Sequence, residues 1–211
     1  MNDPTQLSIY QLRAVLNGVS PLVWRRFLLS IETSLADLHK ILQLSFGWSG
    51  FYLYEFCIHG KTFGSNAEDP RSVCLGDFQL RPVERFRYRY NFLVFWESDL
   101  RLEATVPLHE DLIYPRCVGG RHPAPDEDDG GAWDYQRLQG HYKLPPLEAL
   151  SVLAETTQNV FRNDSRVGID LEELEDATHR VEAYLRFRDQ KFDRQRLNRE
   201  LSKLNRNRGA Q

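Results

Sequence analysis

The sequence is poor in the residues that stabilise disulfide-linked or membrane-embedded proteins. Its three cysteines, Cys57, Cys74 and Cys117, are scattered along 211 residues, and no two of them form a C-x-x-C pair. This pattern is typical of reduced thiols in the cytosol. No apolar run approaches the roughly 18 residues of a membrane span, and no basic segment precedes an apolar run near the N-terminus. We therefore expect a soluble cytoplasmic protein with no membrane partner.

Familiar catalytic and cofactor signatures are also missing. The chain has no G-x-G-x-x-G, no Walker-type glycine-lysine loop, no G-x-S-x-G and no H-E-x-x-H motif. Its six histidines show no short paired spacing that suits zinc. The net charge of −3 gives no global attraction to nucleic acid, so such an affinity has to come from a local patch. These absences argue against familiar enzyme classes.

The patterns that are present predict one α+β domain over residues 1–211. Apolar runs at 9–16 and 23–29 flank a turn at 17–21 and predict a β-hairpin. Ser34 and Asp37 form a capping box ahead of a helix that ends at Gly47. A further strand is expected at 53–59. Residues 1–107 are thus a sheet-rich half, an antiparallel sheet with one packed helix.

The clearest strand signal runs from Arg85 to Trp96, where apolar and basic residues alternate. Residues 100–106 alternate in the same way and are its expected partner through a turn at 97–99. Trp24, Phe86, Tyr88 and Phe92 are predicted to be core residues.

The second half of the chain divides into a loop and a helical region. Residues 108–144 are rich in proline, glycine and acidic residues and predict a long loop without regular structure. Residues 145–207 predict helices that begin near Pro145, Asp170 and Asp193. The fold is therefore expected to end in a helical half.

The loop offers one candidate site. Asp126, Glu127, Asp128 and Asp129 are hard oxygen ligands for a divalent metal, with Cys117 and His122 nearby in sequence. An EF-hand is excluded, since Gly130 and Arg137 occupy positions where ligands are needed. The alternative is a solvated acidic turn.

The C-terminal helix offers another. Residues 186–208 contain nine Arg or Lys and three Asp or Glu, a local charge of +6. Arg199, Lys203 and Arg206 form a basic stripe that suits a phosphate backbone, and the strand arginines Arg85, Arg87 and Arg89 can extend it. The alternative is an ordinary solvated helix face.

Several segments together resemble the Ri-plasmid ORF-three-like family, which includes TnpR-type passenger proteins of insertion elements. The resemblance rests on the opening Tyr10-Gln11-Leu12 and Gly18 to Arg26, on Leu38-His39, Gly47-Trp48, Tyr114 to Cys117, Gly120-Arg121, Pro125, Glu127-Asp128, Gly130-Gly131 and Tyr135, and on the closing Phe192-Asp193 and Leu197-Asn198. It implies an α+β fold and an association with plasmids and mobile elements, without a known activity. No serine-recombinase pattern is present, so resolvase activity is not carried over.

The departures from the family pattern fall at polar positions. Where the family has His-Leu-His-Glu-Phe, this chain has Tyr52 to Phe56, and only Glu55 and its apolar neighbours remain. Where the family has Tyr-Asp-Phe-Gly-Asp followed by tryptophan and histidine, this chain has Tyr90 to Val94, then Trp96 and Ser98. If those groups form a metal or acid–base site in relatives, the remnant here is Glu55, Cys117, Glu127 and Asp128.

Three functional hypotheses follow, in this order. The first is a non-catalytic interaction protein of a mobile element or plasmid, which binds another protein through its aromatic sheet and acidic loop. The second is a nucleic-acid-associated factor that uses the basic C-terminal helix. The third is a divalent-metal-dependent enzyme centred on Glu55, Cys117, Glu127 and Asp128.

Overall fold

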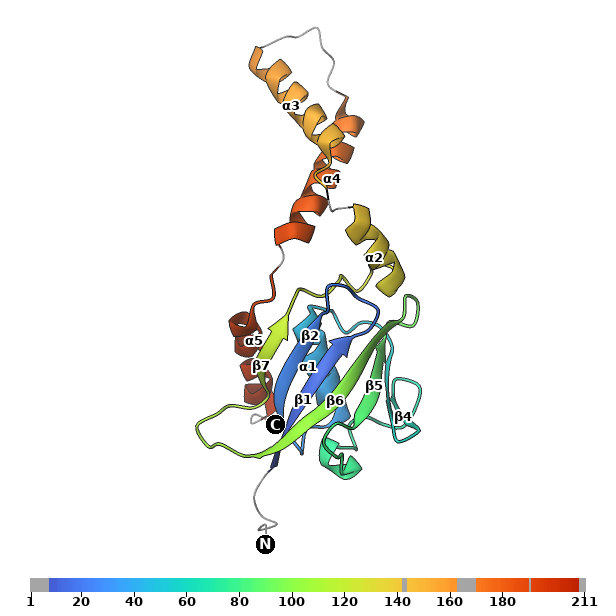
Figure 1. The fold of residues 1–211 in the computed structure, drawn as a ribbon, viewed down its shortest axis with the longest axis vertical. Coiled ribbons are helices and arrows are strands. Elements are labelled where there is room, and N and C mark those ends of the chain that lie inside the picture. Colours follow the sequence, from blue (N-terminus) through green and yellow to red (C-terminus); the bar gives the residue numbers. More distant parts are fainter. Residues whose placement is uncertain (1–7, 142–143, 163–169, 190, 209–211) are drawn as a thin grey trace. The chain divides into compact units, whose positions relative to one another are not determined.

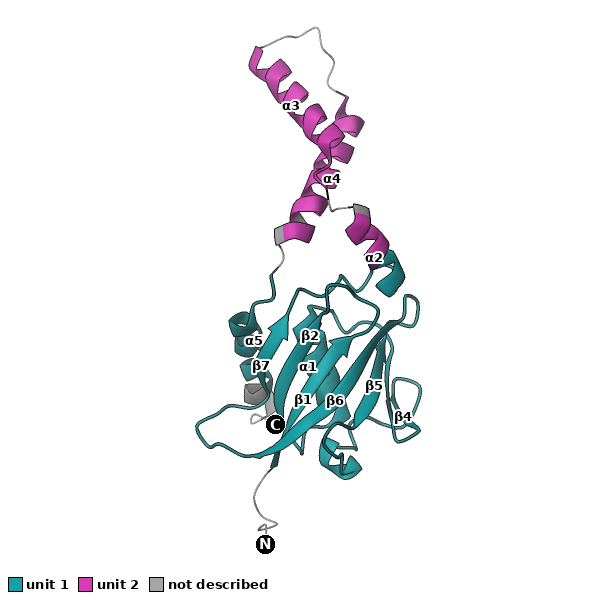
Figure 2. Cartoon of the chain, in the orientation of Figure 1, with its two compact units in different colours: residues 1–135, 191–211 teal, residues 136–190 magenta. Residues whose placement is uncertain are grey.

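The computed structural model describes residues 8–141, 144–162, 170–189 and 191–208 (Figure 1). The chain forms two compact units, one of residues 1–135 and 191–211 and one of residues 136–190 (Figure 2). The first unit holds an antiparallel sheet with a packed helix, and the second is helical. The predicted α+β class is confirmed.

The first unit is built on a seven-stranded sheet. Its strands are β1 (Ser8–Leu16), β2 (Trp24–Ser30), β3 (Tyr54–Ile58), β4 (Lys61–Gly64), β5 (Arg85–Tyr90), β6 (Trp96–Pro107) and β7 (Arg116–Arg121). They lie in the order β4-β3-β5-β6-β1-β2-β7, and every neighbouring pair is antiparallel. A short 3-10 helix, η1 (Leu75–Phe78), lies between β4 and β5. Strands β1, β2, β5 and the first part of β6 alternate between buried residues and more exposed residues.

Helix α1 (Leu35–Phe46) lies against one face of this sheet. The Ser34 hydroxyl accepts a hydrogen bond from the Asp37 N–H at 3.1 Å, and Gly47 ends the helix in the left-handed region with φ 77°. Both end signals that the sequence carries are therefore used. Leu35, Leu38 and Leu42 are fully buried on the face that meets the sheet.

The strand expected over 85–96 ends earlier than predicted, at Tyr90. Asn91 takes a positive φ of 52°, and its carbonyl accepts hydrogen bonds from the N–H groups of Val94 and Phe95. This turn ends the alternation, so Phe92 is 36% exposed and the prediction that it belongs to the core is wrong. Trp24 is also not in the core, because β2 turns Arg25 toward α1 and leaves Trp24 on the other face. Phe86 and Tyr88 are buried as predicted.

The segment 108–144 is not a structureless loop. It contains β7 and helix α2 (Gly131–His141). The sequence of strand β7 lacks the alternation of apolar and polar residues that predicts a strand. It begins and ends with arginine and contains two glycines. Gly120 is required there, because a Cβ atom at this position would lie 2.3 Å from the Phe192 ring.

Helix α5 (Arg194–Arg208) covers the edge strand β7. The side-chain amide of Asn198 accepts from the Cys117 N–H at 2.8 Å and donates to the Cys117 carbonyl at 2.9 Å. The Arg194 guanidinium donates to the Val118 carbonyl at 3.0 Å. These bonds take the place of a neighbouring strand, and Leu197 and Leu201 bury the apolar side of the helix.

Arg25 joins the parts of the first unit and is only 1% exposed. Its guanidinium donates to the Ser45 carbonyl in the last turn of α1 at 3.0 Å, and to the Trp24 and Arg121 carbonyls at 2.8 and 3.0 Å. It lies 3.8 Å from the centre of the Phe192 ring, just before α5. Burial lowers the pKa of Arg25 to about 10, so the group stays cationic at neutral pH.

The second unit contains the helices α3 (Leu147–Arg162) and α4 (Leu171–Asp189). The Arg180 guanidinium lies 3.6 Å from the Glu148 carboxylate, which places the start of α3 beside the second half of α4. The helical half predicted from residue 145 onward is thus present. No helix in the described parts of the chain is long and apolar enough to cross a membrane.

Candidate functional site

The acidic loop that precedes α2 is fixed to the sheet by hydrogen bonds to its backbone. The Trp48 indole donates to the Pro125 carbonyl at 3.0 Å. The Trp96 indole and the Asn91 amide both donate to the Glu127 carbonyl, each at 3.0 Å. The loop is therefore anchored and is not a freely solvated turn.

The carboxylates of this loop are engaged by tyrosine hydroxyls. Glu127 accepts from the Tyr90 hydroxyl at 2.5 Å and from the Ser49 N–H at 3.0 Å, and Asp128 accepts from the Tyr52 hydroxyl at 2.6 Å. The bond to Asp128 raises the pKa of Tyr52 to about 12, while burial and then Glu127 raise the pKa of Tyr90. Both tyrosines remain protonated at neutral pH and act as hydrogen-bond donors.

His39 lies beneath this network, at the centre of a group of tyrosines. Its ring stacks on Tyr54 with centroids 3.6 Å apart, and its Nδ1 lies 2.8 Å from the Tyr88 hydroxyl. The Gln43 amide donates a hydrogen bond to the same hydroxyl oxygen at 2.6 Å. The Tyr88 hydroxyl proton is therefore available to be donated to the His39 Nδ1. Burial lowers the pKa of His39 to about 4, so it is a neutral hydrogen-bond acceptor at pH 7.

The two sheet loops that contact Glu127 also carry large exposed apolar side chains. These loops are neighbours, since the Asn91 N–H donates to the Leu53 carbonyl at 3.0 Å. We call this surface the apolar rim, and it consists of Phe51, Leu53, Phe92, Leu93 and Phe95. Phe51 and Leu93 are 86% and 85% exposed.

The turn that carries three of the five residues of the apolar rim is held in an unusual conformation. Phe95 has a φ of 66°, which bulky residues rarely adopt. Its N–H donates to the Asn91 carbonyl at 2.6 Å, and its ring lies 6.2 Å from Phe92 and 5.5 Å from the Arg89 guanidinium. Strain of this kind is retained where the surroundings fix the conformation, often at binding surfaces.

The structure does not bring the four predicted metal ligands together. Glu127 and Asp128 are neighbours, but Glu55 on β3 pairs with Arg89 at 2.9 Å. Cys117 lies on β7, with four strands between it and β3, a separation of roughly 24 Å at 4.8 Å per strand. Burial raises the pKa of the Cys117 thiol. Within the described residues, no group of three or more His, Cys, Asp or Glu side chains could hold a metal ion.

The predicted basic surface is also divided. On β5, Arg85 lies 4.0 Å from Asp99, Arg87 lies 3.8 Å from Glu97, and Arg89 binds both Glu97 and Glu55 at 2.9 Å. Arg199 and Lys203 are exposed on α5, beside β7 and α1, and Lys203 binds Glu200. The Arg206 side chain lies outside the described residues. The strand arginines therefore belong to ion pairs and do not extend the stripe on α5.

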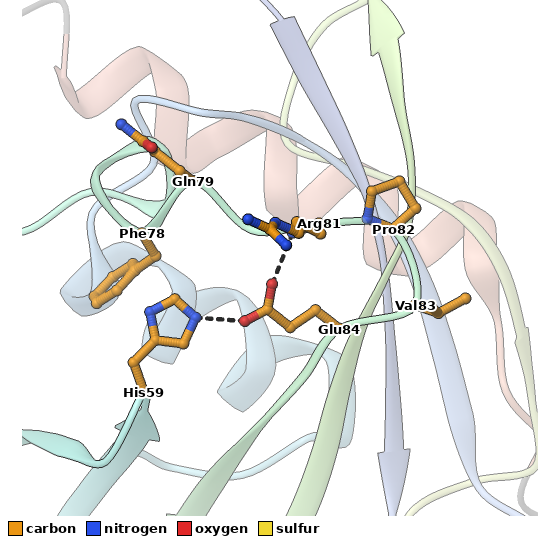
Figure 3. A pocket seen from close by; sticks show the side chains of 7 residues that line it. All are labelled: His59, Phe78, Gln79, Arg81, Pro82, Val83 and Glu84. Atoms are coloured by element: carbon orange, nitrogen blue, oxygen red, sulfur yellow. Dashed lines mark hydrogen bonds and ion pairs between the residues drawn. The ribbon is translucent and has the colours of Figure 1, made fainter.

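A separate depression lies between η1 and β5 (Figure 3). It has a volume of about 530 Å³ and is lined by His59, Phe78, Gln79, Arg81, Pro82, Val83 and Glu84. The Glu84 carboxylate binds the His59 imidazole and accepts from the Arg81 N–H at 2.8 Å. His59, Gln79 and Val83 all have positive φ values. The lining has no Ser, Thr, Cys or Lys side chain.

The sequence pointed to part of this arrangement but not to its centre. The departures from the family pattern, at 52–56 and 90–98, meet where β3, β5 and β6 lie side by side, with Tyr54 opposite Tyr90 and Tyr88 opposite Ser98. His39 was missed. Its position on the apolar side of the predicted helix, beside Leu38 and Leu42, was the signal that could have identified it.

Comparison with known proteins agrees with this fold. The model of the plasmid pRiA4b ORF-3-like protein family matches residues 8–165. The uncharacterised protein y4hQ of Sinorhizobium fredii is 33% identical over 139 residues, which cover 62% of this chain and 71% of that protein. The crystal structure of MM3350 from Methanosarcina mazei Go1, a protein of unknown function, aligns with a TM-score of 0.59 and 27% identity over 83% of this chain and 90% of that one. This chain therefore belongs to the plasmid pRiA4b ORF-3-like protein family.

Proposed function

We propose that this chain is a non-catalytic interaction module that binds another protein through the apolar rim. The observation that carries this proposal is the exposure of Phe51 and Leu93 on loops whose backbones are held by hydrogen bonds. Exposed apolar side chains on a rigid support lose little conformational entropy on binding, which favours association.

The state of the polar groups supports binding over catalysis. Glu127 and Asp128 accept hydrogen bonds from Tyr90 and Tyr52, and His39 is neutral and stacked. A general acid or base needs a pKa near the working pH and an open path to a substrate. The carboxylates and the imidazole are instead engaged with Ser49 and with tyrosines on or next to the loops that carry the rim.

Photocrosslinking in cells that express this chain tests the proposal. We expect p-benzoylphenylalanine at position 51 or 93 to capture one defined protein in high yield, because both side chains project from the apolar rim. Mass spectrometry identifies the adduct. The purified partner should then bind the unlabelled chain, and a Phe51→Ser/Leu93→Ser variant should bind at least tenfold more weakly.

The matched control is position 83. Val83 is also apolar and 72% exposed, but it lies at the depression beside Glu84 and not on the rim. Equal capture from positions 51, 93 and 83 would indicate non-specific contact and would contradict the proposal.

A second candidate function is nucleic-acid binding along the α5 edge. Six exposed cations lie on β7 and α5, namely Arg116, Arg121, Arg194, Arg196, Arg199 and Lys203. Residues 116–121 and 193–208 together contain these six cations, Arg206 and Arg208 against Asp193 and Glu200, so 8 − 2 gives a local charge of +6. Cations from two adjoining elements can follow a phosphate backbone.

Salt dependence of duplex DNA binding checks this candidate. Each phosphate contact contributes about 0.9 to the slope of log affinity against log salt, so Arg196→Ala/Arg199→Ala should reduce that slope by about 2. Arg85→Ala/Arg87→Ala is the control, because those arginines already face carboxylates on β6. Fluorescence anisotropy between 50 and 200 mM salt gives the slopes. Absence of binding at 50 mM, or equal slopes for both variants, would exclude the α5 edge.

A further inference from the structure

We propose that the second unit is a self-association element, in which α3 of one chain packs antiparallel against α3 of a second copy. This surface is separate from the apolar rim and does not depend on the proposed function.

The second unit is a helical pair with very little interior. The buried apolar residues in its described part are Ala149, Ala177 and Tyr184. Ala149 on α3 and Ala177 on α4 are small, which suits close approach of two helices. In a pair of helices, each helix buries one face against the other. A second apolar face on α3 therefore stays exposed unless another partner covers it.

Such a face is present on α3. Leu147, Leu150, Ala154, Thr157 and Phe161 are all exposed, and their spacing of 3, 4, 3 and 4 residues is the seam of a coiled coil. Leu147 and Phe161 are 70% and 85% exposed. The residues buried toward α4 lie on a different side of the helix. No charged residue interrupts the seam.

The order of side-chain sizes along the seam fits an antiparallel second copy. Large residues lie at the two ends and the small Ala154 lies at the centre. With a two-fold axis at Ala154, this residue meets Ala154 of the second copy, and Leu147 meets Phe161 of the second copy. The seam then complements itself, as a symmetric dimer interface requires.

Charge on α4 favours the same direction. Its first half contains Glu172, Glu173, Glu175 and Asp176 and no Lys or Arg, a charge of −4. Its second half, residues 180–188, contains three arginines and one glutamate, a charge of +2. A parallel dimer would bring the two acidic halves to the same end of the assembly. An antiparallel dimer brings the acidic half of each α4 to the same end as the basic half of the other.

The first measurement is the mass of the full chain in solution by light scattering at micromolar concentration. We expect about twice the 24.7 kDa of one chain. Ala154→Glu should weaken the dimer at least tenfold, because two carboxylates would meet at the axis. Ala154 is exposed within the pair of helices, so this change should leave folding intact, as circular dichroism can confirm. Glu155→Lys, one residue away from the seam, should remain dimeric.

Cysteine crosslinking tests the direction independently of that variant. In a Cys57→Ser/Cys74→Ser background, with Cys117 buried, Ala154→Cys should form a disulfide-linked dimer under mild oxidation and Leu147→Cys should not. Crosslinking at both positions would indicate a parallel pair and overturn the proposal. A monomeric chain at 100 µM, or a dimer that Ala154→Glu does not weaken, would overturn it as well, and the seam would then belong to another protein or to another part of this chain.

Discussion

Replacing Arg25 with alanine is expected to lower the free energy of unfolding by about 3–5 kcal/mol. The change removes a long side chain that is 1% exposed and leaves a cavity between α1, β2 and Phe192. It also removes the donors to the carbonyls of Ser45, Trp24 and Arg121. The Ser45 carbonyl lies in the last turn of α1, where a cation also interacts favourably with the helix dipole. Urea unfolding at pH 7 measures the loss.

Two further substitutions separate the causes of this effect. Arg25→Lys keeps a positive charge, but the lysine ammonium group lacks the planar guanidinium that donates to three carbonyls. We therefore expect a free energy of unfolding between those of the original chain and Arg25→Ala. Arg121→Ala removes a nearby side chain that is exposed, and we expect a change within about 0.5 kcal/mol. A loss below about 1 kcal/mol for Arg25→Ala would show that Arg25 does not join these elements energetically.

Acidification is expected to destabilise the chain through His39. The folded-state pKa of His39 is about 4, against an ordinary value of 6.5. Between these values the unfolded chain binds a proton that the folded chain does not bind, so stability falls as the pH falls from 6.5 toward 4. At 1.36 kcal/mol per pKa unit, the total loss from this residue is about 3 kcal/mol. Below pH 4 the folded chain is protonated too, and the loss stops.

The measurement is the free energy of unfolding at several pH values from 7.5 to 4 for the original chain and for His39→Gln. Glutamine does not titrate, so the variant should lack the part of the pH dependence that His39 contributes. Leu42→Ala on the same helix is the control, since it removes buried apolar volume and no titratable group, so it should lower stability and leave the slope unchanged. Identical slopes for the original chain and His39→Gln would mean that folding does not lower the pKa of His39, and would contradict the prediction.

The sequence predicted the elements whose local pattern agrees with the final structure. The hairpin of β1 and β2 and the helix α1 were predicted, because turn residues, a serine cap and a glycine stop all lie within those segments. Strand β7 was missed, because its pairing depends on Asn198 and Phe192, more than 70 residues away. The end of β5 was missed, because Asn91 adopts positive φ in a segment whose apolar residues continue beyond it.

The candidate site was predictable in its parts and not in its assembly. The acidic loop and the tyrosines at 52, 54 and 90 were noticed as separate features. Their connection depends on bonds between residues far apart in sequence, such as Tyr90 with Glu127 and Tyr52 with Asp128. The proposed metal ligands do not lie together, because their sequence positions did not predict the strand on which each of them lies. Cys117 is on β7, at the edge of the sheet opposite β4.

The amide of Asn198 also determines when the sheet becomes complete during synthesis. The ribosome makes the chain from its N-terminus, so β7 leaves it well before α5 does. Until residue 198 emerges, the Cys117 N–H and carbonyl have no partner from α5, and the nascent sheet has an open edge that can pair with another strand. Closure of that edge is therefore a late event in the life of the nascent chain.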